Sequence, residues 1–238
     1  MRVAVLSDVH GNATALSAVL AELAAERPDL VVFGGDLTWG AQPAETYRLA
    51  SALDNALFVR GNADRAVLER VAESDRERWM QEQHTPALRE FLGGFADSQL
   101  AEVDGLGAVR FCHGSPRSDE ECVTPETPDE RVREFMAGVD ERVVVTAHVH
   151  IQFDRDVAGV RSVNAGSVGL PYEGRPGAYW ALLGPDVELR RTEYDVDEAV
   201  SAYRESGFPD PKPLVELLLA PPAPTEVIEH AEQVVFAG

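Results

Sequence analysis

Five short motifs of histidine, acidic and amide residues recur along this chain, and each directly follows an apolar run. The chain has six histidines in 238 residues, and four of them fall within these motifs. The motifs are Asp8-Val9-His10-Gly11-Asn12, Gly34-Gly35-Asp36, Arg60-Gly61-Asn62-Ala63-Asp64, Cys112-His113-Gly114 and Ala147-His148-Val149-His150. Imidazole and carboxylate groups are the usual protein ligands of catalytic transition metals. The motifs therefore predict a metal site built at the ends of strands.

The first half of the chain has the pattern of alternating strands and helices. Its apolar runs are short and rich in Val, Leu and Phe, which is typical of buried parallel strands. We expect strands at 2–7, 30–34, 56–59, 108–112 and 142–146. Leucine and valine recur at helical spacing over 13–26, with Asn12 as N-cap and Pro28 past the end. Further helices are predicted over 46–53, 64–72, 75–92 with a break at Pro86, and 129–136.

After His150 the hydrophobic period changes to that of antiparallel strands. Strands are predicted at 153–157, 161–164, 178–183 and 187–194, joined by tight turns into a meander. The whole chain is then a single domain, 1–238, in which two packed sheets have helices outside. A proline-rich C-terminal extension, about 209–238, contains two short predicted helices near 214–219 and 227–236.

Composition limits the partners that this chain can bind. The net charge is −20, which disfavours long nucleic acid, whose phosphates need Lys and Arg, and also an anionic membrane surface. No segment approaches about 18 consecutive apolar residues, so no transmembrane helix is predicted. The first strand reaches Ser7-Asp8 at once, without a signal-peptide core, and we expect a cytoplasmic protein. A homo-oligomer stays open.

The predicted topology brings the motifs together. Open α/β sheets place their ligands beyond the carboxyl ends of the strands, where all five motifs lie. Asp8 and His10 leave the first strand together, and two glycines before Asp36 let the backbone approach an ion closely. One Asp-x-His pair is weak evidence, but five motifs in order at strand ends are strong evidence for one site.

This ordered set resembles the calcineurin-like metallophosphoesterases. Their pattern is Asp-x-His, Gly-Asp, Gly-Asn-x-(Asp or Glu) in which x is His, Cys or another residue, a lone His, and Gly-His-x-His. The resemblance runs from Met1 to about Tyr194 and is closest to the small bacterial and archaeal phosphodiesterase branch. It implies an α/β fold, a four-layer α/β/β/α sandwich of two mixed β-sheets flanked by helices.

The resemblance also implies a binuclear metal centre. One divalent ion would be held by Asp8, His10, Asp36 and His150, and the other by Asp36, Asn62, His113 and His148. Asp36 would bridge the two ions, and a hydroxide between them would attack phosphorus in line. Mn²⁺ is the expected metal, with Fe, Zn, Ni or Co as alternatives.

Two positions depart from the family pattern. Many relatives have histidine, as general acid or transition-state contact, at the position of Ala63. Asp64 remains as the candidate catalytic residue, but a methyl group beside it cannot donate a proton. Ala147 stands where the family has glycine, which would cost on the order of 1–2 kcal/mol if that position needs a positive φ.

Other chemically active residues have more ordinary interpretations. His84 and His230 are predicted to face solvent, and His84 is the first alternative source of a proton. Cys112 beside His113 suggests a nucleophilic pair, although a buried small residue is the better interpretation, and no disulfide framework is expected. Three arginines in or near predicted loops could reach a substrate or simply lie on the surface: Arg65, Arg117 and Arg175. Asn164, Gly166 and Ser167 shape a turn or support the ligands.

The function expected from the resemblance is a metal-dependent phosphodiesterase acting on small soluble phosphodiesters. A phosphomonoesterase or a nucleotide pyrophosphohydrolase is the alternative within enzymes. A scaffold that keeps the fold without turnover is the alternative outside enzymes. Scaffolds of this superfamily lose metal histidines, whereas all seven ligand positions are filled here, which favours an enzyme.

Overall fold

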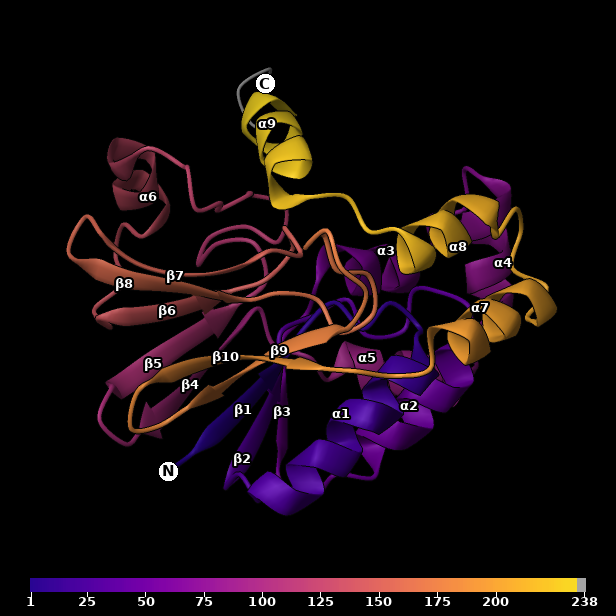
Figure 1. Cartoon of the computed structure of the whole chain (residues 1–238), viewed down its shortest axis with the longest axis horizontal. Coiled ribbons are helices and arrows are strands. Elements are labelled where there is room, and N and C mark those ends of the chain that lie inside the picture. Colours follow the sequence, from indigo (N-terminus) through magenta and orange to yellow (C-terminus); the bar gives the residue numbers. More distant parts are fainter. Residues whose placement is uncertain (235–238) are drawn as a thin grey trace.

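The computed structural model describes residues 1–234, which form two five-stranded sheets with helices outside them (Figure 1). Sheet I has the strand order β10-β9-β1-β2-β3. Its strands are β1 (Val3–Leu6), β2 (Leu30–Phe33), β3 (Ala56–Phe58), β9 (Ala178–Leu183) and β10 (Val187–Thr192). The strands β1, β2 and β3 run parallel to one another. Strand β9 runs antiparallel to both of its neighbours, β1 and β10, so sheet I is mixed.

Sheet II has the order β4-β5-β6-β8-β7 and is also mixed. Its strands are β4 (Ser98–Val103), β5 (Gly107–Cys112), β6 (Val143–Thr146), β7 (Gln152–Val157) and β8 (Val160–Ala165). The central strands β5, β6 and β8 are parallel, and the two edge strands pair antiparallel. The carboxyl ends of the parallel strands in both sheets carry the five motifs.

Three hydrophobic layers hold the fold together. Between the sheets, inward side chains such as Val5, Phe111 and Val145 form one buried core. On the outer face of sheet I, Leu6 and Phe33 pack against helices α1 (Ala13–Glu26), α2 (Pro43–Ser51), α3 (Asn62–Leu68) and α5 (Pro86–Gly93). On the outer face of sheet II, Val144 and Phe153 pack against α6 (Asp129–Phe135) and α9 (Pro224–Val234). The predicted α/β/β/α sandwich is confirmed.

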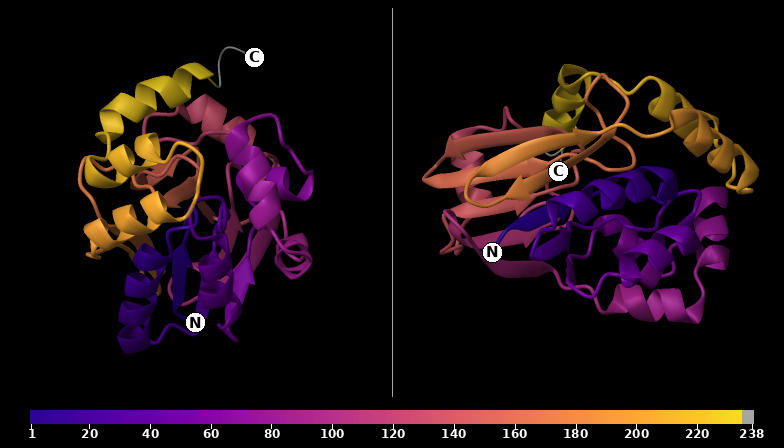
Figure 2. Two further views of the ribbon diagram at one scale, coloured as in Figure 1. Left: turned by 90° about the vertical axis from the view of Figure 1, so that its right-hand side faces the viewer. Right: turned by 60° about the horizontal axis from the view of Figure 1, so that its bottom comes forward.

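A fourth hydrophobic cluster joins the C-terminal helices to the body. It includes Met80 of α4 (Asp75–Gln83), Tyr203 of α7 (Val196–Glu205) and Leu218 of α8 (Lys212–Leu219). In Figure 2 the C-terminal helices α7 and α8, coloured orange to yellow, run along one side of the molecule. They are amphipathic, with apolar residues at helical spacing, so burial of one face explains why a proline-rich segment folds here.

Most predicted elements are present, with ends shifted by a few residues. Asn12 caps α1 by accepting from the N–H of Ala15, and Thr85 caps α5 after the predicted break. The predicted meander is wrong, because β8 and β9 lie in different sheets and β8 pairs parallel to β6. Strand β4 and helix α7 were not predicted from the sequence. Residues 235 and 236 of the helix predicted over 227–236 lie outside the described residues.

Within residues 1–234, the helices are all too short or too polar to cross a bilayer. This agrees with the hydropathy of the sequence.

Candidate metal centre

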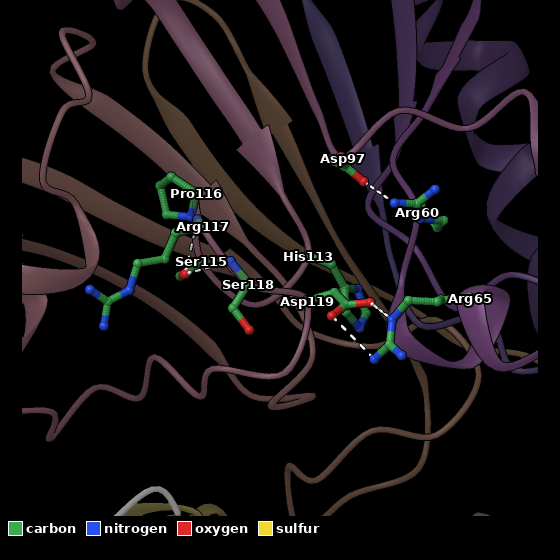
Figure 3. Close-up of a pocket in the computed structure, with 9 residues that line it drawn as sticks. All are labelled: Arg60, Arg65, Asp97, His113, Ser115, Pro116, Arg117, Ser118 and Asp119. Atoms are coloured by element: carbon green, nitrogen blue, oxygen red, sulfur yellow. Dashed lines mark hydrogen bonds and ion pairs between the residues drawn. The ribbon is translucent and has the colours of Figure 1, made fainter. Parts of the chain in front are cut away.

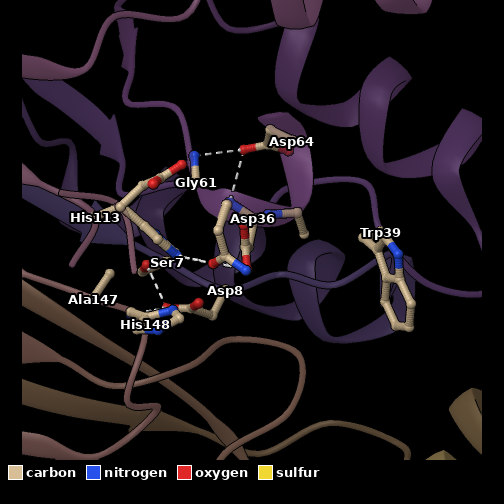
Figure 4. A network of polar contacts seen from close by, with 12 residues as sticks. Ser7, Asp8, Asp36, Trp39, Gly61, Asp64, His113, Ala147 and His148 are labelled. Carbon is tan, nitrogen blue, oxygen red and sulfur yellow. Dashed lines mark hydrogen bonds and ion pairs between the residues drawn. The ribbon is translucent and has the colours of Figure 1, made fainter. Parts of the chain in front are cut away.

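The loops after β1, β2, β5 and β6 are linked by backbone hydrogen bonds. The N–H of Asp8 donates to Gly35, at 3.0 Å, and the N–H of Ala147 donates to His113, at 2.7 Å. The first bond joins two loops of sheet I and the second joins two loops of sheet II, at the edge where the carboxyl ends of parallel strands meet. Between the sheets, His113 Nδ1 lies 2.8 Å from the backbone oxygen of Gly34. The ligand-bearing motifs are thus brought together by the topology (Figure 4).

Ligand atoms of the predicted residues lie within a few ångströms of one another. The Nε2 atoms of His10 and His150 are 3.2 Å apart, and Asp8 Oδ1 is 3.1 Å from His150 Nε2. Asp36 Oδ2 lies 3.6 Å from Nε2 of His10 and 3.6 Å from Nε2 of His113. Two triads have all ligand atoms within 4.8 Å of each other, Asp8-His10-His150 and Asp8-Asp36-His113. The second triad includes Asp8, which the sequence assigned to the first ion alone.

The remaining two predicted ligands border the same cluster. The amide oxygen of Asn62 is 3.0 Å from Nε2 of His113. The ring of His148 packs against that of His113, with centroids 5.1 Å apart, and its backbone N–H donates to Asp8 Oδ2 at 3.2 Å. All seven residues therefore surround one small volume.

Three of the histidines are held in the orientation that a metal ligand needs. Their Nδ1 atoms lie beside backbone carbonyls: His10 at 3.2 Å from Trp39, His113 at 2.8 Å from Gly34, and His150 at 2.6 Å from Leu170. A ring nitrogen beside a carbonyl oxygen carries the proton, which leaves Nε2 as the free lone pair. The free Nε2 atoms all face the cluster.

Five of the predicted ligands have a left-handed backbone conformation. The φ angles are 51° at Asp8, 47° at His10, 53° at Asp36, 68° at His148 and 58° at His150. Residues other than glycine seldom adopt this conformation, which costs free energy and is concentrated at functional sites. The strain is evidence that these side chains are aimed by the surrounding structure. Ala147 does not have a positive φ, so its departure from the family glycine carries no such cost.

The loop that carries Asp36 is fixed by a second carboxylate. Asp64, the candidate catalytic residue from the sequence, is fully buried and accepts hydrogen bonds from three backbone N–H groups (Figure 4). The donors are Asp36 at 2.8 Å, Leu37 at 3.1 Å and Gly61 at 3.0 Å. Both oxygens of Asp64 are thus engaged in holding the two loops together.

Gly61 allows these loops to approach closely. A Cβ atom at this position would overlap the carboxylate and the backbone nitrogen of Asp36. A glycine is therefore required at position 61, because any larger residue would clash with Asp36.

Charges in the cluster are strongly coupled. Burial would raise the pKa of Asp8, but His150 lowers it to about 2. Burial also opposes the charged form of His113, yet the Asp36 and Asp8 carboxylates raise the pKa of its imidazole to about 10. The carboxylates therefore stabilise protonated imidazole beside them, and a divalent cation can supply the same positive charge in place of the protons.

The residues present fit a metal ion. Asp8 Oδ1 is buried, and no group among residues 1–234 donates a hydrogen bond to it. A buried carboxylate oxygen without a donor is costly unless a cation satisfies it. Donor atoms on one ion lie roughly 3–3.5 Å apart, since ligand bonds are roughly 2.0–2.2 Å long. The distances in the cluster are close to that range.

Side chains behind the ligands support their loops. The hydroxyl of Ser167 donates to the backbone oxygen of Asp8 at 2.7 Å, and Asn164 Nδ2 donates to that of Ala147 at 2.7 Å. These two residues therefore support ligand loops as well as shaping a turn. Tyr203 was not predicted to lie near the site, but its buried hydroxyl donates to the backbone oxygen of His10 at 2.8 Å.

The three candidate substrate arginines are engaged in ion pairs, and Arg65 lies in α3, not in a loop. Arg65 lines a cavity beside His113, where its guanidinium pairs with Asp119 at 2.7 Å (Figure 3). Arg117 pairs with Glu121 at 2.8 Å, and Arg175 with Glu193 at 3.1 Å. The interpretation of these arginines as ordinary paired side chains is the one that the geometry favours.

The remaining histidines and cysteines divide between the core and the surface. The prediction that His84 faces solvent is wrong: it is 4% exposed, its Nδ1 donates to Met80 at 2.6 Å, and Nε2 lies 2.9 Å from Thr38 Oγ1. The residues next to His84 in the sequence are mostly polar, so the hydropathy pattern did not indicate that its side chain is buried. His230 is exposed, as predicted. Cys112 is buried, and burial raises the pKa of its thiol to about 12, as suits a core residue.

The ligand cluster opens onto a cavity of 290 Å³. Its lining combines five predicted ligands with apolar side chains that the sequence analysis did not place near the site: Trp39, Leu170, Tyr172, Leu214 and Leu217. The apolar residues come from loops and from α8, and no local pattern marks them as site residues.

The chain is similar to several known proteins. An uncharacterised protein of Methanocaldococcus jannaschii, MJ0912, is 25% identical over 236 residues, with 87% of this chain and 94% of that protein covered. A metallophosphoesterase from Sphaerobacter thermophilus is 27% identical, with a TM-score of 0.75, and 92% of this chain and 98% of that chain are covered. The hypothetical protein PH1004 from Pyrococcus horikoshii is 20% identical, with a TM-score of 0.78 and coverages of 91% and 97%.

The strongest comparison is with a protein family. Residues 1–184 match the calcineurin-like phosphoesterase superfamily domain. This match includes every motif that forms the cluster. The chain therefore belongs to the calcineurin-like phosphoesterase superfamily.

Proposed function

We propose that this chain is a metal-dependent phosphodiesterase that hydrolyses small phosphodiesters. The observation that carries the proposal is a buried cluster of ligand atoms opening onto a cavity whose described lining contains no Lys or Arg. A phosphomonoester carries a second negative charge, which a cationic side chain would stabilise. A diester carries one charge and two organic groups. The cavity suits the diester better.

The chain's own residues account for metal binding. In the proposal, Asp8, His10, Asp36 and His150 hold one ion, and Asp36, Asn62, His113 and His148 hold the other. Mn²⁺ is the proposed metal, because mixed imidazole, carboxylate and amide ligands suit it, although Fe, Zn, Ni and Co also bind such sets. Once bound, two divalent ions would supply Lewis-acid activation of water and of the phosphoryl group.

The protein positions these ligands before substrate arrives. Asp36 Oδ1 accepts from the N–H of Ala63 at 2.8 Å, which leaves Oδ2 facing His10 and His113. We propose that Asp64 acts as a positioning residue for Asp36, since both of its oxygens accept backbone hydrogen bonds. Neither Ala63 nor Asp64 then donates a proton to the leaving group.

The test compares two substrates that share one leaving group. Protein reconstituted with Mn²⁺ is assayed on methyl p-nitrophenyl phosphate and on p-nitrophenyl phosphate. We expect the diester to have the higher kcat/KM by at least about tenfold, which corresponds to about 1.4 kcal/mol of transition-state stabilisation. Chelation should remove the activity, and added Mn²⁺ should restore it.

Other outcomes point to the alternatives. Preference for the monoester would indicate a phosphomonoesterase, and cleavage of nucleoside diphosphate esters alone would indicate a pyrophosphohydrolase. Metal binding without turnover on any ester would indicate a scaffold. His113→Ala should abolish turnover, whereas the exposed His230→Ala should not change it.

A further inference from the structure

The cavity beside the ligand cluster is lined by two chemically different sets of residues. One set is the predicted metal ligands His10, Asp36, Asn62, His148 and His150. The other set, called the apolar wall below, is Trp39, Leu170, Tyr172, Leu214 and Leu217. A phosphate group bound at the ligands would therefore place its ester substituent against aromatic and aliphatic side chains.

The two leucines come from outside the matched family domain. That match ends at residue 184, and α8 begins at Lys212. Leu214 is 7% exposed and, with Val215 and Leu218, belongs to the cluster that packs α8 on the body. Leu217 is partly buried at the edge of the same cluster. The C-terminal extension thus supplies a wall of the cavity.

A chain of aromatic contacts fixes this extension beside Trp39. The ring of Phe208 packs edge-on against Trp39, with centroids 5.7 Å apart, and against Trp79 at 5.2 Å. Arg76 lies over Phe208, and its guanidinium donates to the backbone oxygen of Asp210 at 2.7 Å. These contacts precede α8 directly in the chain, so they set the position of its first turn.

The same wall contacts the ligands themselves. The ring of Tyr172 stacks on that of His150, with centroids 4.7 Å apart and an interplanar angle of 17°. The ring of Trp39 stands edge-on to that of His10, with centroids 6.3 Å apart. Tyr203 of α7 donates to the backbone oxygen of His10. The apolar wall is therefore continuous with the metal centre.

The lining has the character of a site for an organic group. Aromatic faces and leucine side chains bind planar or apolar groups by burial of apolar surface and by ring stacking. Among the described lining residues, Asp36 is the only carboxylate and there is no Lys or Arg. A small or strongly hydrated ester group would leave this apolar surface exposed to water.

We propose that Trp39, Tyr172, Leu214 and Leu217 form a specificity subsite that binds a planar or apolar ester group of the substrate. The proposal rests on the proposed phosphodiesterase function and deepens it. The C-terminal extension is then part of the active site, and the preferred substrates are phosphodiesters with an aromatic or similarly bulky ester group.

The test measures binding separately from turnover. The probes are the monomethyl esters of phenylphosphonic and methylphosphonic acid, which carry the same charge and differ in one substituent. Calorimetry on the Mn²⁺-loaded protein should give about tenfold or more tighter binding of the phenyl compound, as apolar pockets discriminate between substituents of different size. Leu217→Ser should reduce this ratio about three- to tenfold and leave the methyl compound's affinity unchanged.

The matched control is Leu219→Ser on the same helix, where the side chain is 47% exposed and lines no part of the cavity. This variant should keep the wild-type ratio. A wild-type ratio near one, or equal loss of both probes in Leu217→Ser, would overturn the subsite. The wild-type measurement needs no variant to fold.

The two proposals fail in different ways. If the protein hydrolyses p-nitrophenyl diesters but binds the two probes equally well, the subsite proposal is rejected and the phosphodiesterase proposal stands. If the protein binds the phenyl probe more tightly but hydrolyses no ester, the phosphodiesterase proposal is rejected and the apolar binding site stands.

Discussion

The carboxylate of Asp64 accepts a hydrogen bond of 2.8 Å from the backbone N–H of Asp36. It lies behind the ligand, and Asp36 itself faces His10 and His113. A buried acidic residue next to a metal site is easily interpreted as a proton donor. The hydrogen bonds of Asp64 instead indicate that it sets the position of Asp36, whose Oδ2 lies 3.6 Å from Nε2 of both His10 and His113.

Replacing Asp64 with asparagine should therefore weaken metal binding. The new NH₂ group would face at least one backbone N–H, so a donor would meet a donor where an oxygen now accepts. Groups that orient metal ligands typically contribute about 10–100-fold to metal affinity or activity. We expect a loss of Mn²⁺ affinity of that order for Asp64→Asn, measured by competition with a chelator.

The control is Asp75→Asn, whose side chain is 82% exposed on α4 and which should bind Mn²⁺ like the wild type. A general-acid role makes the opposite prediction. Asp64→Asn would then keep its Mn²⁺ affinity, lose kcat, and lose the basic limb of the pH–rate profile.

The methyl side chain of Ala63 cannot donate a proton, so no side chain at that position can protonate the leaving group. General acid catalysis is typically worth about 10²–10⁴-fold, so its absence should make the rate depend steeply on leaving-group pKa. Aryl diesters should be good substrates and simple alkyl diesters poor ones. The measurement is log kcat/KM against leaving-group pKa for the wild type and for Ala63→His.

The introduced imidazole should flatten this dependence and raise activity on monoesters. Ala63 is partly exposed in the first turn of α3, so the position can accept a larger side chain. Ala63→Gln is the matched control, with similar bulk and no titrating group. A shallow slope in the wild type that neither variant changes would show that another group supplies the proton.

Protonation of the buried His84 imidazole should lower the free energy of unfolding in mild acid. Burial lowers the pKa of its imidazole from 6.5 to about 4, and nearby Arg89 contributes in the same direction. The unfolded state then binds more protons between these values, so stability is complete above pH 6.5 and decreases as the pH falls toward 4. One pKa unit corresponds to 1.36 kcal/mol, so the full loss is on the order of 3 kcal/mol.

The check is urea unfolding of chelated protein at pH 7.5 and pH 5. The histidines of the candidate metal centre also titrate, so the comparison is between the wild type and His84→Gln, which keeps a donor and an acceptor. The wild type should lose more stability than the variant on acidification, and the exposed His230→Gln should behave like the wild type. Equal losses in wild type and His84→Gln would contradict the buried neutral imidazole.

The sequence alone was sufficient to predict the layers of the fold and the convergence of the ligands. The reason is local: each ligand motif follows an apolar strand directly, and parallel strands carry their carboxyl ends to the same edge. The helix over 13–26 was predicted because Asn12 and the leucine spacing mark its face. These signals lie within a few residues of the structure that they determine.

The features that were missed depend on contacts between distant segments. His84 lies in a polar stretch, and only its packing under Thr38 and Met80 makes it buried. The split of β8 and β9 between two sheets is decided by strand pairing, which hydrophobic alternation does not encode. Leu217 reaches the cavity because Phe208 packs on Trp39, an interaction between residues far apart in the chain.

The central claim is that two metal ions share Asp36, and metal content measures it most directly. Wild type, His150→Ala and Asp36→Ala are loaded with Mn²⁺, dialysed at one fixed free concentration, and analysed by mass spectrometry for bound metal. We expect about two ions per chain in the wild type, about one in His150→Ala, and almost none in Asp36→Ala, because Asp36 Oδ2 lies 3.6 Å from Nε2 of both His10 and His113. One ion in the wild type, or as much metal and turnover in Asp36→Ala as in His150→Ala, would contradict it.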